Sequence, residues 1–436
     1  MKKIIFSLLF TFFVSAMFGQ DMKKAQKYLA DKQLDKAKTE IDGLVAKDPS
    51  NGEANYLKAK IYGEITTSEQ FKNLATPTML DEAFTSVQKA LDDTTNGKLA
   101  LMAAQDKYSA LINLYSDFYG EGAKAFNEAA GSGSKAGYEQ AMNEFIKAND
   151  VGKYIAKKNI AKLGEVDTTL VLNIGKAALN AKKDDEAMKY FKMLADANIK
   201  GTSEGNTAGF QIPYQWLTLH YKDAKDEANM KKYSDLGTKL FPDEDYFTLV
   251  EMDYYREKKD NPALFAKYDQ LTAAHPDSLT YHFNYANDIF GYLYNSDEGT
   301  VIKDKPGLIK TLGNQVEAAY KINPNDVNNN WLYAQYYYNL GIEIRDSANK
   351  VKGPKPEDVK RKADLNDEAK ANFNKAVPYG EKALSALEAS YLKADKSRYK
   401  SITDLMQKIY QSTSQNDKVK AYQDKYDAAD DKFVKE

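Results

Sequence analysis

The chain has 436 residues, with 61 basic and 63 acidic side chains, three histidines and no cysteine. This nearly neutral balance gives no general attraction to phosphate backbones or anionic lipid, and the lack of cysteine excludes disulfides and metal–thiolate sites. Only four of the basic residues are arginine. Because proteins mostly use the planar arginine side chain to bind phosphates and base edges through two hydrogen bonds, nucleic acid is not an expected partner.

The first 19 residues have the pattern of a secretory signal peptide. Lys2 and Lys3 precede an apolar run over residues 4–14, and small and polar residues follow it. The run is too short to span a bilayer comfortably. We therefore expect residues 1–19 to be removed on export of a bacterial protein. The mature chain is expected in the periplasm, at the outer envelope or secreted, without stable membrane insertion.

A fixed set of spacings recurs from Ala25 onward. A tyrosine follows after three positions, a small residue after twelve, apolar residues after 16 and 19, and Pro49 after 24. Pro242 and Pro276, which close two successive copies, lie 34 residues apart. Further copies of the spacings begin at Gly175, Thr218 and Met252. Helical spacing in each half, a polar turn between the halves and a closing proline together predict a series of antiparallel helix pairs.

Other copies are interrupted in the turn between their two helices. The copies that begin at Ala59, Ala286 and Ala334 resume twelve, fourteen and thirty residues later than the spacings predict. A lengthened interhelical turn costs little closure entropy and leaves the stacking of the pairs undisturbed. We predict a flexible turn over residues 131–134 and a solvated loop over residues 350–362.

The spacings resemble those of the tetratricopeptide repeat (TPR) family. The first copy carries the resemblance at Ala25, Tyr28, Ala37 and Pro49. It implies an all-α fold, namely a right-handed superhelical TPR solenoid of about eight helix-turn-helix units, several of them with inserted turns. We place N-terminal units in residues 20–199 and C-terminal units with a weak terminal cap in residues 210–436. The glycine- and serine-containing segment 200–209 is a predicted hinge loop between them.

No residue pattern points to catalysis. His220, His275 and His282 are not spaced as metal ligands, and Gly120, Gly122 and Ala125 follow no strand that would make them a dinucleotide-binding turn. The known hydrolase, metalloprotease and phosphate-loop motifs are absent from the sequence. We predict that the protein is not an enzyme and has no cofactor, metal or catalytic residue.

The TPR resemblance also implies a concave groove lined by the first helix of each unit. Aromatic rings, amides and one arginine at these positions are typical of protein-binding surfaces. The predicted partner-binding positions are Asp253, Arg256, Phe283, Asn287, Phe290, Asn328, Trp331, Gln335 and Tyr338. The alternative for Phe283, Phe290 and Trp331 is that these rings pack between adjacent units.

Two functions follow from these features. The main prediction is an exported scaffold or adaptor that binds other proteins or peptides, expected to belong to the cell envelope. The 31 tyrosines support an alternative, a glycan-binding helical protein resembling the SusD-like class, because aromatic rings stack on sugars. That class is typically anchored through a lipid, and this chain has no cysteine to carry one.

Overall fold

The computed structural model describes residues 21–160, 167–297 and 299–435. Every regular element in these ranges is a helix, and the only strand-like pairing there is an isolated bridge between Leu392 and Lys435. The predicted all-α fold is therefore confirmed. None of the helices within these ranges is long and apolar enough to cross a membrane. The predicted signal peptide lies outside the described residues.

The chain divides into two compact units, Met1–Phe247 and Thr248–Glu436, which we call unit 1 and unit 2. The segment 200–209, predicted as a hinge, lies inside unit 1 and runs between two helices of that unit. Its role as a hinge stays a prediction, as do the number of repeat units and the hand of the superhelix.

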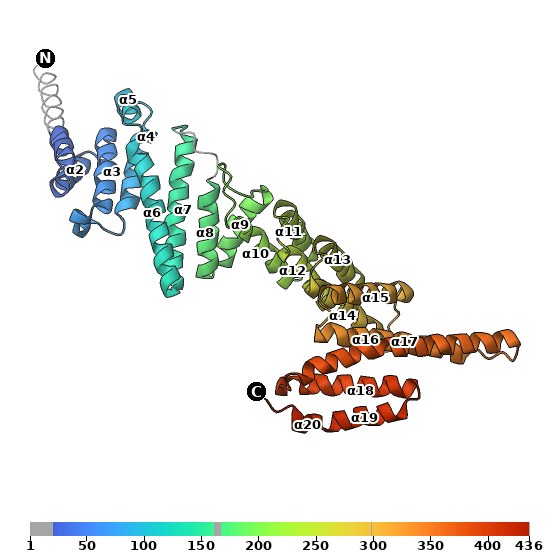
Figure 1. Ribbon diagram of the computed structural model, residues 1–436. Coiled ribbons are helices and arrows are strands. Elements are labelled where there is room, and N and C mark those ends of the chain that lie inside the picture. The colour runs from blue at the N-terminus through green and yellow to red at the C-terminus, as the bar shows by residue number, and fades with distance from the viewer. Residues whose placement is uncertain (1–20, 161–166, 298, 436) are drawn as a thin grey trace, which may run out of the picture. The chain divides into compact units, whose positions relative to one another are not determined.

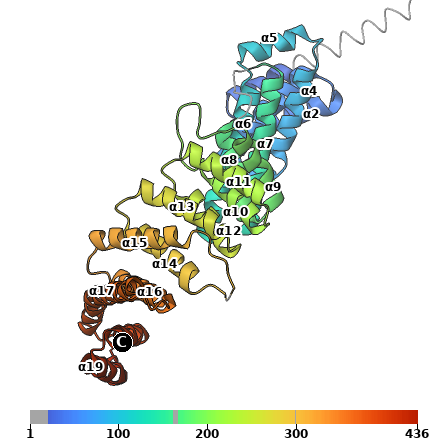
Figure 2. The same cartoon turned by 90° about the vertical axis from the view of Figure 1, so that its right-hand side faces the viewer.

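Unit 1 is a series of antiparallel helix pairs in chain order, and Figures 1 and 2 both show α6 and α7 lying side by side as one such pair. Its described elements are a first helix over 21–30, α2 (Leu34–Lys47), α3 (Gly52–Thr67), the short 3-10 helix η1 (Glu69–Leu74), α4 (Met79–Asp92), α5 (Gly97–Gln105), α6 (Ser109–Ser132), α7 (Lys135–Lys157), α8 (Thr168–Ala181), α9 (Asp184–Asp196), α10 (Ile212–Asp223) and α11 (Glu227–Leu240). The series matches the predicted tetratricopeptide-like helix pairs.

Unit 2, taken by itself, also consists of helices packed in chain order. Its elements are α12 (Tyr246–Glu257), which begins at the end of unit 1, α13 (Asn261–Ala274), α14 (Leu279–Tyr294), α15 (Lys305–Ile322), α16 (Val327–Lys350), α17 (Pro356–Glu388), the short 3-10 helix η2 (Lys393–Asp395), α18 (Lys396–Ser412), α19 (Asn416–Asp427) and α20 (Ala429–Lys432). The most extensive helix contact in the unit joins α16 to α17, and α18 packs on α17.

The turns inside four of the pairs share a conformation that explains the polar residues seen there. In each, a lysine one or two positions after the end of the first helix lies in the left-handed region, with φ between 56° and 62°. The backbone reverses at this residue, and the second helix begins two positions later. These residues are Lys32, Lys182, Lys225 and Lys259. A repeated backbone turn of one type therefore accompanies the repeated spacing in the sequence.

Glycine in the first helix of a pair allows a phenylalanine of the second helix to approach closely. A Cβ atom at Gly175 would overlap the ring of Phe191, which is fully buried. The same relation joins α6 to α7 and α16 to α17, through Gly122 and Phe145 and through Gly341 and Phe373. The small residues that define the repeat thus mark the points where the helices of one pair are in contact.

Two predicted loops are shorter than expected, at residues 133–134 and 351–355. Residues 131–134 are not a long flexible turn, because α6 continues through Ser132 and Ser134 already caps α7 by accepting the Gly137 amide. Residues 350–362 are mostly helical, since α17 begins at Pro356. Proline is favourable in the first turn of a helix, where its missing N–H is not needed, and Glu357 in the same turn complements the helix dipole.

Buried tyrosines join neighbouring helices through a recurring triad of a tyrosine, a carboxylate and a basic side chain. A buried phenol donates to a carboxylate at 2.6 to 3.1 Å, and the same carboxylate pairs with a lysine or arginine. Within the described residues we find six such triads: Tyr56–Asp106–Lys60, Tyr62–Asp42–Lys38, Tyr154–Asp92–Lys158, Tyr233–Asp196–Lys232, Tyr268–Asp288–Arg256 and Tyr399–Glu388–Lys425. Hydrogen bonds to charged groups are the stronger class, so these contacts stabilise the stacking of the helices.

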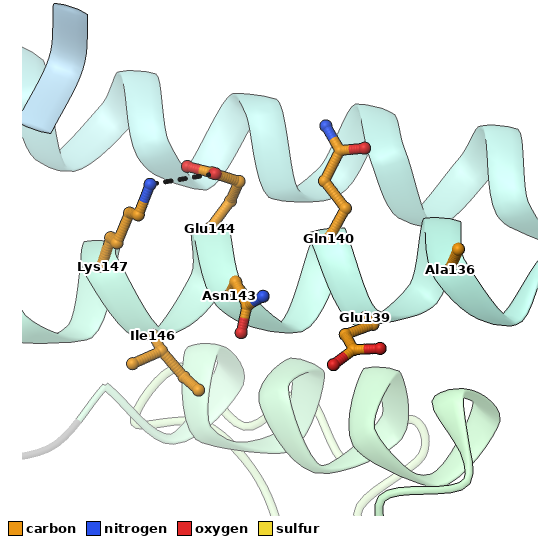
Figure 3. A pocket seen from close by; sticks show the side chains of 7 residues that line it. All are labelled: Ala136, Glu139, Gln140, Asn143, Glu144, Ile146 and Lys147. Atoms are coloured by element: carbon orange, nitrogen blue, oxygen red, sulfur yellow. Dashed lines mark hydrogen bonds and ion pairs between the residues drawn. The ribbon is translucent and has the colours of Figure 1, made fainter. Parts of the chain in front are cut away.

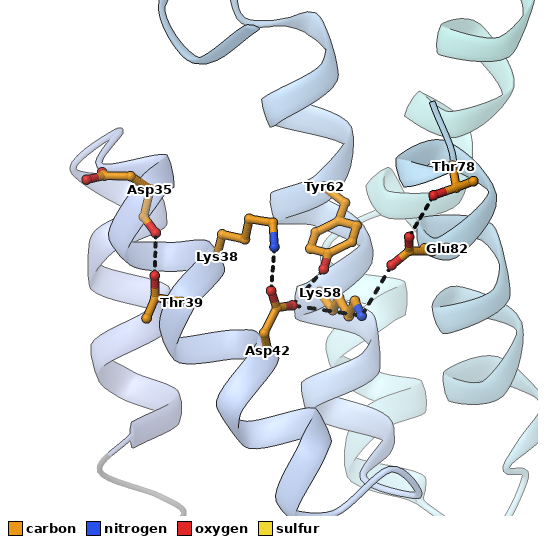
Figure 4. A network of polar contacts seen from close by, with 8 residues as sticks. All are labelled: Asp35, Lys38, Thr39, Asp42, Lys58, Tyr62, Thr78 and Glu82. Atoms are coloured by element: carbon orange, nitrogen blue, oxygen red, sulfur yellow. Dashed lines mark hydrogen bonds and ion pairs between the residues drawn. The ribbon is translucent and has the colours of Figure 1, made fainter. Parts of the chain in front are cut away.

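Figure 4 shows one triad in place. Asp42 on α2 accepts the Tyr62 phenol of α3 at 2.7 Å and pairs with Lys38 at 2.6 Å. Lys58 lies 3.8 Å from both Asp42 and Glu82, which brings α4 into the network. Burial, together with the adjacent carboxylate, raises the pKa of Tyr62 well above its usual value, so the phenol keeps its donor proton.

Candidate functional site

The predicted groove positions on α12 are exposed but already paired. Arg256 lies 2.8 Å from Asp253 and 3.1 Å from Asp288 of α14. Its guanidinium also donates to the Tyr268 hydroxyl at 3.2 Å. Arg256 therefore joins α12 to α14 and Asp253 assists it, so a partner would meet this arginine as part of an ion-pair network.

The predicted positions on α14 and α16 divide by exposure. Asn287 is exposed, whereas Phe283 and Phe290 are half-buried, and the Phe290 ring lies 5.0 Å from that of Tyr294 on the same helix. All four positions on α16 are half-buried, namely Asn328, Trp331, Gln335 and Tyr338. Of the nine predicted residues, only Asp253, Arg256 and Asn287 are thus exposed.

Two rings on α16 contact the core of unit 2. Trp331 and Tyr338 pack against the buried cluster formed by α17 and α18, and the Tyr338 ring lies 5.7 Å from that of Phe373. The indole nitrogen of Trp331 is buried and has no hydrogen-bond partner within the described residues. These contacts agree with the packing alternative for Trp331, while leaving part of each ring open to solvent.

A pocket lies on the corresponding face of unit 1, between the helix over 21–30, α3 and the end of α5. Its volume is ≈ 430 Å³, of the size that ligand pockets have in proteins. It is lined by Gln26, Leu29, Ala30, Lys32, Glu53, Tyr56, Leu57, Lys60, Glu64, Met102 and Asp106. The apolar part comes from three different helices, so the pocket exists only because the first two pairs are stacked.

The pocket lies at the groove positions of the repeat. The positions one, four and five after the start of the first copy are Gln26, Leu29 and Ala30, and all three line the pocket. In the second copy, which begins at Ala59, the corresponding positions include Lys60 and Glu64, which also line it. The spacings that give the predicted groove positions of unit 2 therefore also give residues of this pocket, which was not among the predicted sites.

Charges around the pocket neutralise one another. Lys32 pairs with Glu64 at 2.5 Å and Lys60 pairs with Asp106 at 2.8 Å, while Glu53 pairs with Lys98 just outside. Asp106 also accepts the hydroxyls of Tyr56 and Ser109, and hydrogen bonds and the Lys60 charge keep its pKa below the usual value despite partial burial. The pocket thus has an apolar floor and a rim of paired charges. Such a pocket suits an uncharged side chain of a bound peptide, whose polar backbone would lie along the rim.

A second pocket, of ≈ 560 Å³, is a weaker candidate. Figure 3 shows that its seven lining residues all belong to α7, and most are polar: Ala136, Glu139, Gln140, Asn143, Glu144, Ile146 and Lys147. Lys147 is held by Glu144 at 3.2 Å and by Asp81 of α4 at 2.9 Å. The hollow thus follows the surface of one helix and joins no groove positions of successive copies.

A carboxyl group beside the groove of unit 1 provides a pH-dependent test of how α6 packs on α3. Asp117 on α6 lies next to Gly63, another groove position, and burial, with a smaller effect of Glu121, raises its pKa to about 6. Because the folded-state pKa exceeds the unfolded one, ionisation of Asp117 lowers stability as pH rises from about 4 to 6. We expect Asp117→Asn to raise the thermal midpoint at pH 7.5 and to leave it unchanged at pH 4, measured by circular dichroism.

The matched control is Glu128→Gln, an exposed position on the same helix, which should leave the midpoint unchanged at both pH values. A midpoint for Asp117→Asn that shifts equally at both pH values would contradict the assignment of the effect to the buried charge.

The histidines have structural surroundings. His282 is buried between the Gln315 side chain at 2.5 Å and the Pro276 carbonyl at 3.0 Å. The ring of His220 stacks on Trp216, and that of His275 lies near Tyr281. Among the described residues, no group of three or more histidine, aspartate or glutamate side chains is arranged to hold a metal ion.

Comparisons with known proteins give no family for the chain. No family model matches the sequence, and no curated protein sequence matches it. A solved structure of Pseudomonas aeruginosa pilF is 15% identical, covers 63% of this chain and 98% of its own, and superposes with a TM-score of 0.27. The P58(IPK) TPR domain is 11% identical and covers 94% and 98%, with a TM-score of 0.24.

A third structure, the APC/C hetero-tetramer Cut9–Hcn1, is 11% identical, covers 93% of this chain and 85% of its own, and has a TM-score of 0.20. These superpositions are too low to support any argument about function.

Proposed function

We propose that the protein is a non-catalytic scaffold that binds other proteins or peptides along the first helices of its pairs. One observation carries the proposal, namely that groove positions of two successive copies line a single pocket of ≈ 430 Å³ in unit 1. A surface that repeats with the helix pairs suits an extended partner, because each pair offers similar side chains at a regular interval. The pocket is the strongest single anchor point on that surface.

The nature of the pocket favours an apolar anchor residue. Leu29, Leu57 and Met102 supply its apolar lining, whereas the charged residues on the rim are paired with one another. A charged ligand group would have to break an ion pair, while an apolar side chain only displaces water. Hot spots of protein interfaces typically consist of such an anchor surrounded by polar contacts.

The test is an affinity purification from an envelope extract with a variant that fills the pocket. Ala30 is exposed and lines the pocket, so Ala30→Trp blocks it without removing a core contact. We expect the wild type to recover one or a few stoichiometric proteins and Ala30→Trp to reduce that recovery at least about tenfold, as loss of an interface anchor does. The matched control is Ala130→Trp, on an exposed position of α6 outside the pocket.

The outcomes separate the alternatives. Recovery that survives in both variants would place the interface elsewhere, and Asn287→Trp then tests the exposed groove position of unit 2. Recovery of no specific protein by the wild type would overturn the scaffold proposal. Trp331→Ala is unsuitable as a binding probe, because that ring packs against the core of unit 2 and its removal changes stability as well.

The glycan-binding alternative is weakened by the surroundings of the tyrosines. Sugar stacking needs an open ring face, but the rings of Tyr333 and Tyr379 stack on each other at 4.1 Å, and Tyr337 stacks on both. Tyr285 is buried against Tyr268 at 4.9 Å. These rings contact protein on the faces that a sugar would occupy, so helix packing accounts for them.

The proposal includes the location inferred from the sequence. Lys2 and Lys3, followed by an apolar run, support export, and we propose that the scaffold acts in the periplasm or at the outer envelope of a bacterial cell. Cell fractionation with mass spectrometry of the N-terminus tests this. A cytoplasmic protein that retains its first 19 residues would contradict it.

A further inference from the structure

The pair α16–α17 extends into a helical hairpin that the sequence analysis did not predict. In Figure 1 the two helices run on beyond α15 and α18 as an arm of unit 2. Among the described residues, the hydrogen bonds and ion pairs of residues 346–368 stay within the hairpin itself. The last ion pair that joins the hairpin to a neighbouring helix is that of Glu343 on α16, whose carboxylate lies 2.9 Å from the ammonium of Lys305 on α15. The end of the arm is therefore free to meet a partner.

The end of this arm is densely cationic, although the chain as a whole has a net charge of −2. Residues 350–362, which we call the arm tip, contain six basic and two acidic side chains, a formal charge of +4. All six basic side chains are exposed: Lys350, Lys352, Lys355, Lys360, Arg361 and Lys362. Within the described residues, only Lys355 has an ion-pair partner, Glu357 at 3.8 Å. The other five cations thus have no ion-pair partner among the described residues.

The two acidic residues of the arm tip do little to offset this charge. Asp358 is half-buried, and its carboxylate lies over Gly353 inside the loop. Glu357 is already beside Lys355. The positive charge is concentrated at the tip, because the other acidic residues of the arm, Asp346, Asp364, Asp367 and Glu368, lie further back along its two helices.

Apolar side chains stand among these cations. Val359 is 60% exposed, between Asp358 and Lys360, and Pro354 is exposed in the loop. Clustered lysines beside a few exposed apolar groups suit the interface of an anionic membrane, where ammonium groups meet phosphates and apolar groups enter the headgroup layer. An acidic protein surface would gain little from Val359 and Pro354, so the lipid surface fits the tip better.

We propose that the arm tip docks the protein on the surface of an anionic phospholipid membrane. The association is peripheral and reversible, since the attraction comes from a few exposed charges and one or two shallow apolar contacts. It adds a membrane contact to the protein-binding groove and is independent of it, because the groove residues on α16 end at Tyr338, before the protruding residues 346–368, and the others lie on other helices. It also predicts strong dependence on salt, because exposed charges are screened within about 8 Å at physiological ionic strength.

The experiment is flotation of the full chain with large vesicles. We use phosphatidylcholine vesicles with and without roughly one-third phosphatidylglycerol, in low salt and at about 0.15 M ionic strength. The test variant is Lys352→Glu/Lys360→Glu/Lys362→Glu, and the matched control is Lys124→Glu/Lys135→Glu/Lys157→Glu, three exposed lysines of unit 1 with the same change in net charge. Helical circular dichroism and thermal midpoints establish that both variants are folded.

We expect the wild type and the control variant to bind anionic vesicles only, and the arm-tip variant to bind at least about tenfold more weakly. Equal loss in both variants would show an effect of total charge and overturn the proposal, as would equal binding to neutral vesicles. Failure of the wild type to bind vesicles, with retention on immobilised polyglutamate that the arm-tip variant loses, would assign the tip to an acidic protein instead.

Discussion

Phe191→Ala is expected to lower the free energy of unfolding of unit 1 by about 3 to 5 kcal/mol, the usual cost of truncating a buried aromatic ring. Phe191 on α9 is fully buried, and its ring occupies the space that Gly175 leaves on α8. Neither helix can close the resulting cavity without shifting the neighbouring pairs, whose spacing is fixed by the same contacts. Urea denaturation followed by helical circular dichroism measures the loss.

Two further substitutions make this prediction specific to the contact. Met193→Ala on the same helix, at a position 40% exposed, should change stability by no more than about 0.5 kcal/mol. Gly175→Ala should cost about 1 to 3 kcal/mol in the wild type, because the added methyl overlaps the ring.

In the Phe191→Ala background, Gly175→Ala should become neutral or stabilising. The methyl then enters vacated space, and alanine is favoured over glycine in a helix by about 1 kcal/mol. Additive penalties of the two substitutions would contradict the assigned contact.

The helix pairs could be predicted from the sequence because their spacing records physical contacts. A small residue in the first helix, such as Gly175, and a large one in the second, such as Phe191, must recur together wherever two helices approach closely. The arm escaped prediction because Pro354 and Pro356 among dense charges indicate a loop as readily as a helix start. Only the contact of α16 with α17 decides that the helices continue.

The tyrosines could not be interpreted from sequence alone. Tyr62 bonds to Asp42, 20 residues earlier, and Tyr154 bonds to Asp92, 62 residues earlier, so no fixed spacing marks the partners. Which carboxylate a phenol meets depends on how successive pairs are stacked. A composition rich in tyrosine therefore suggested sugar binding, whereas the buried phenols found in the triads act between helices.

The sequence could predict which residues lie on the groove face, but it could not predict which of them form the deepest pocket. The repeat spacing identifies which residues of each first helix lie on the groove face, and Leu29 and Lys60 obey it as well as Asn287 does. The spacing cannot predict how deep a pocket these residues form. The pocket of unit 1 depends on Met102 and Asp106, which come from α5 and the residue after it, an element outside the repeat pattern.

Lys267→Met is the second substitution with a large expected effect, about 3 kcal/mol or more of lost stability in unit 2. Glu251 on α12 is only 1% exposed, and its carboxylate lies 2.5 Å from the ammonium of Lys267 on α13. Methionine keeps much of the aliphatic length of lysine but removes the charge, so the carboxylate stays buried without its cation. Chemical denaturation of the variant measures the cost.

Substitution of the other partner, Glu251→Gln, should cost less stability than Lys267→Met, and this difference tests whether the buried charge causes the loss. Lys267 retains 16% exposure of its side chain, so after Glu251→Gln its long stem allows the ammonium to reach water.

The double variant Glu251→Leu/Lys267→Met should recover most of the stability lost in Lys267→Met, because an apolar pair of similar volume often replaces a buried ion pair without loss. If the double variant is as unstable as the sum of the single ones, the two residues act independently and the pair does not join α12 to α13. If Glu251→Gln proves as costly as Lys267→Met, the penalty comes from lost contacts of both side chains rather than from removal of the Lys267 ammonium from beside the buried carboxylate.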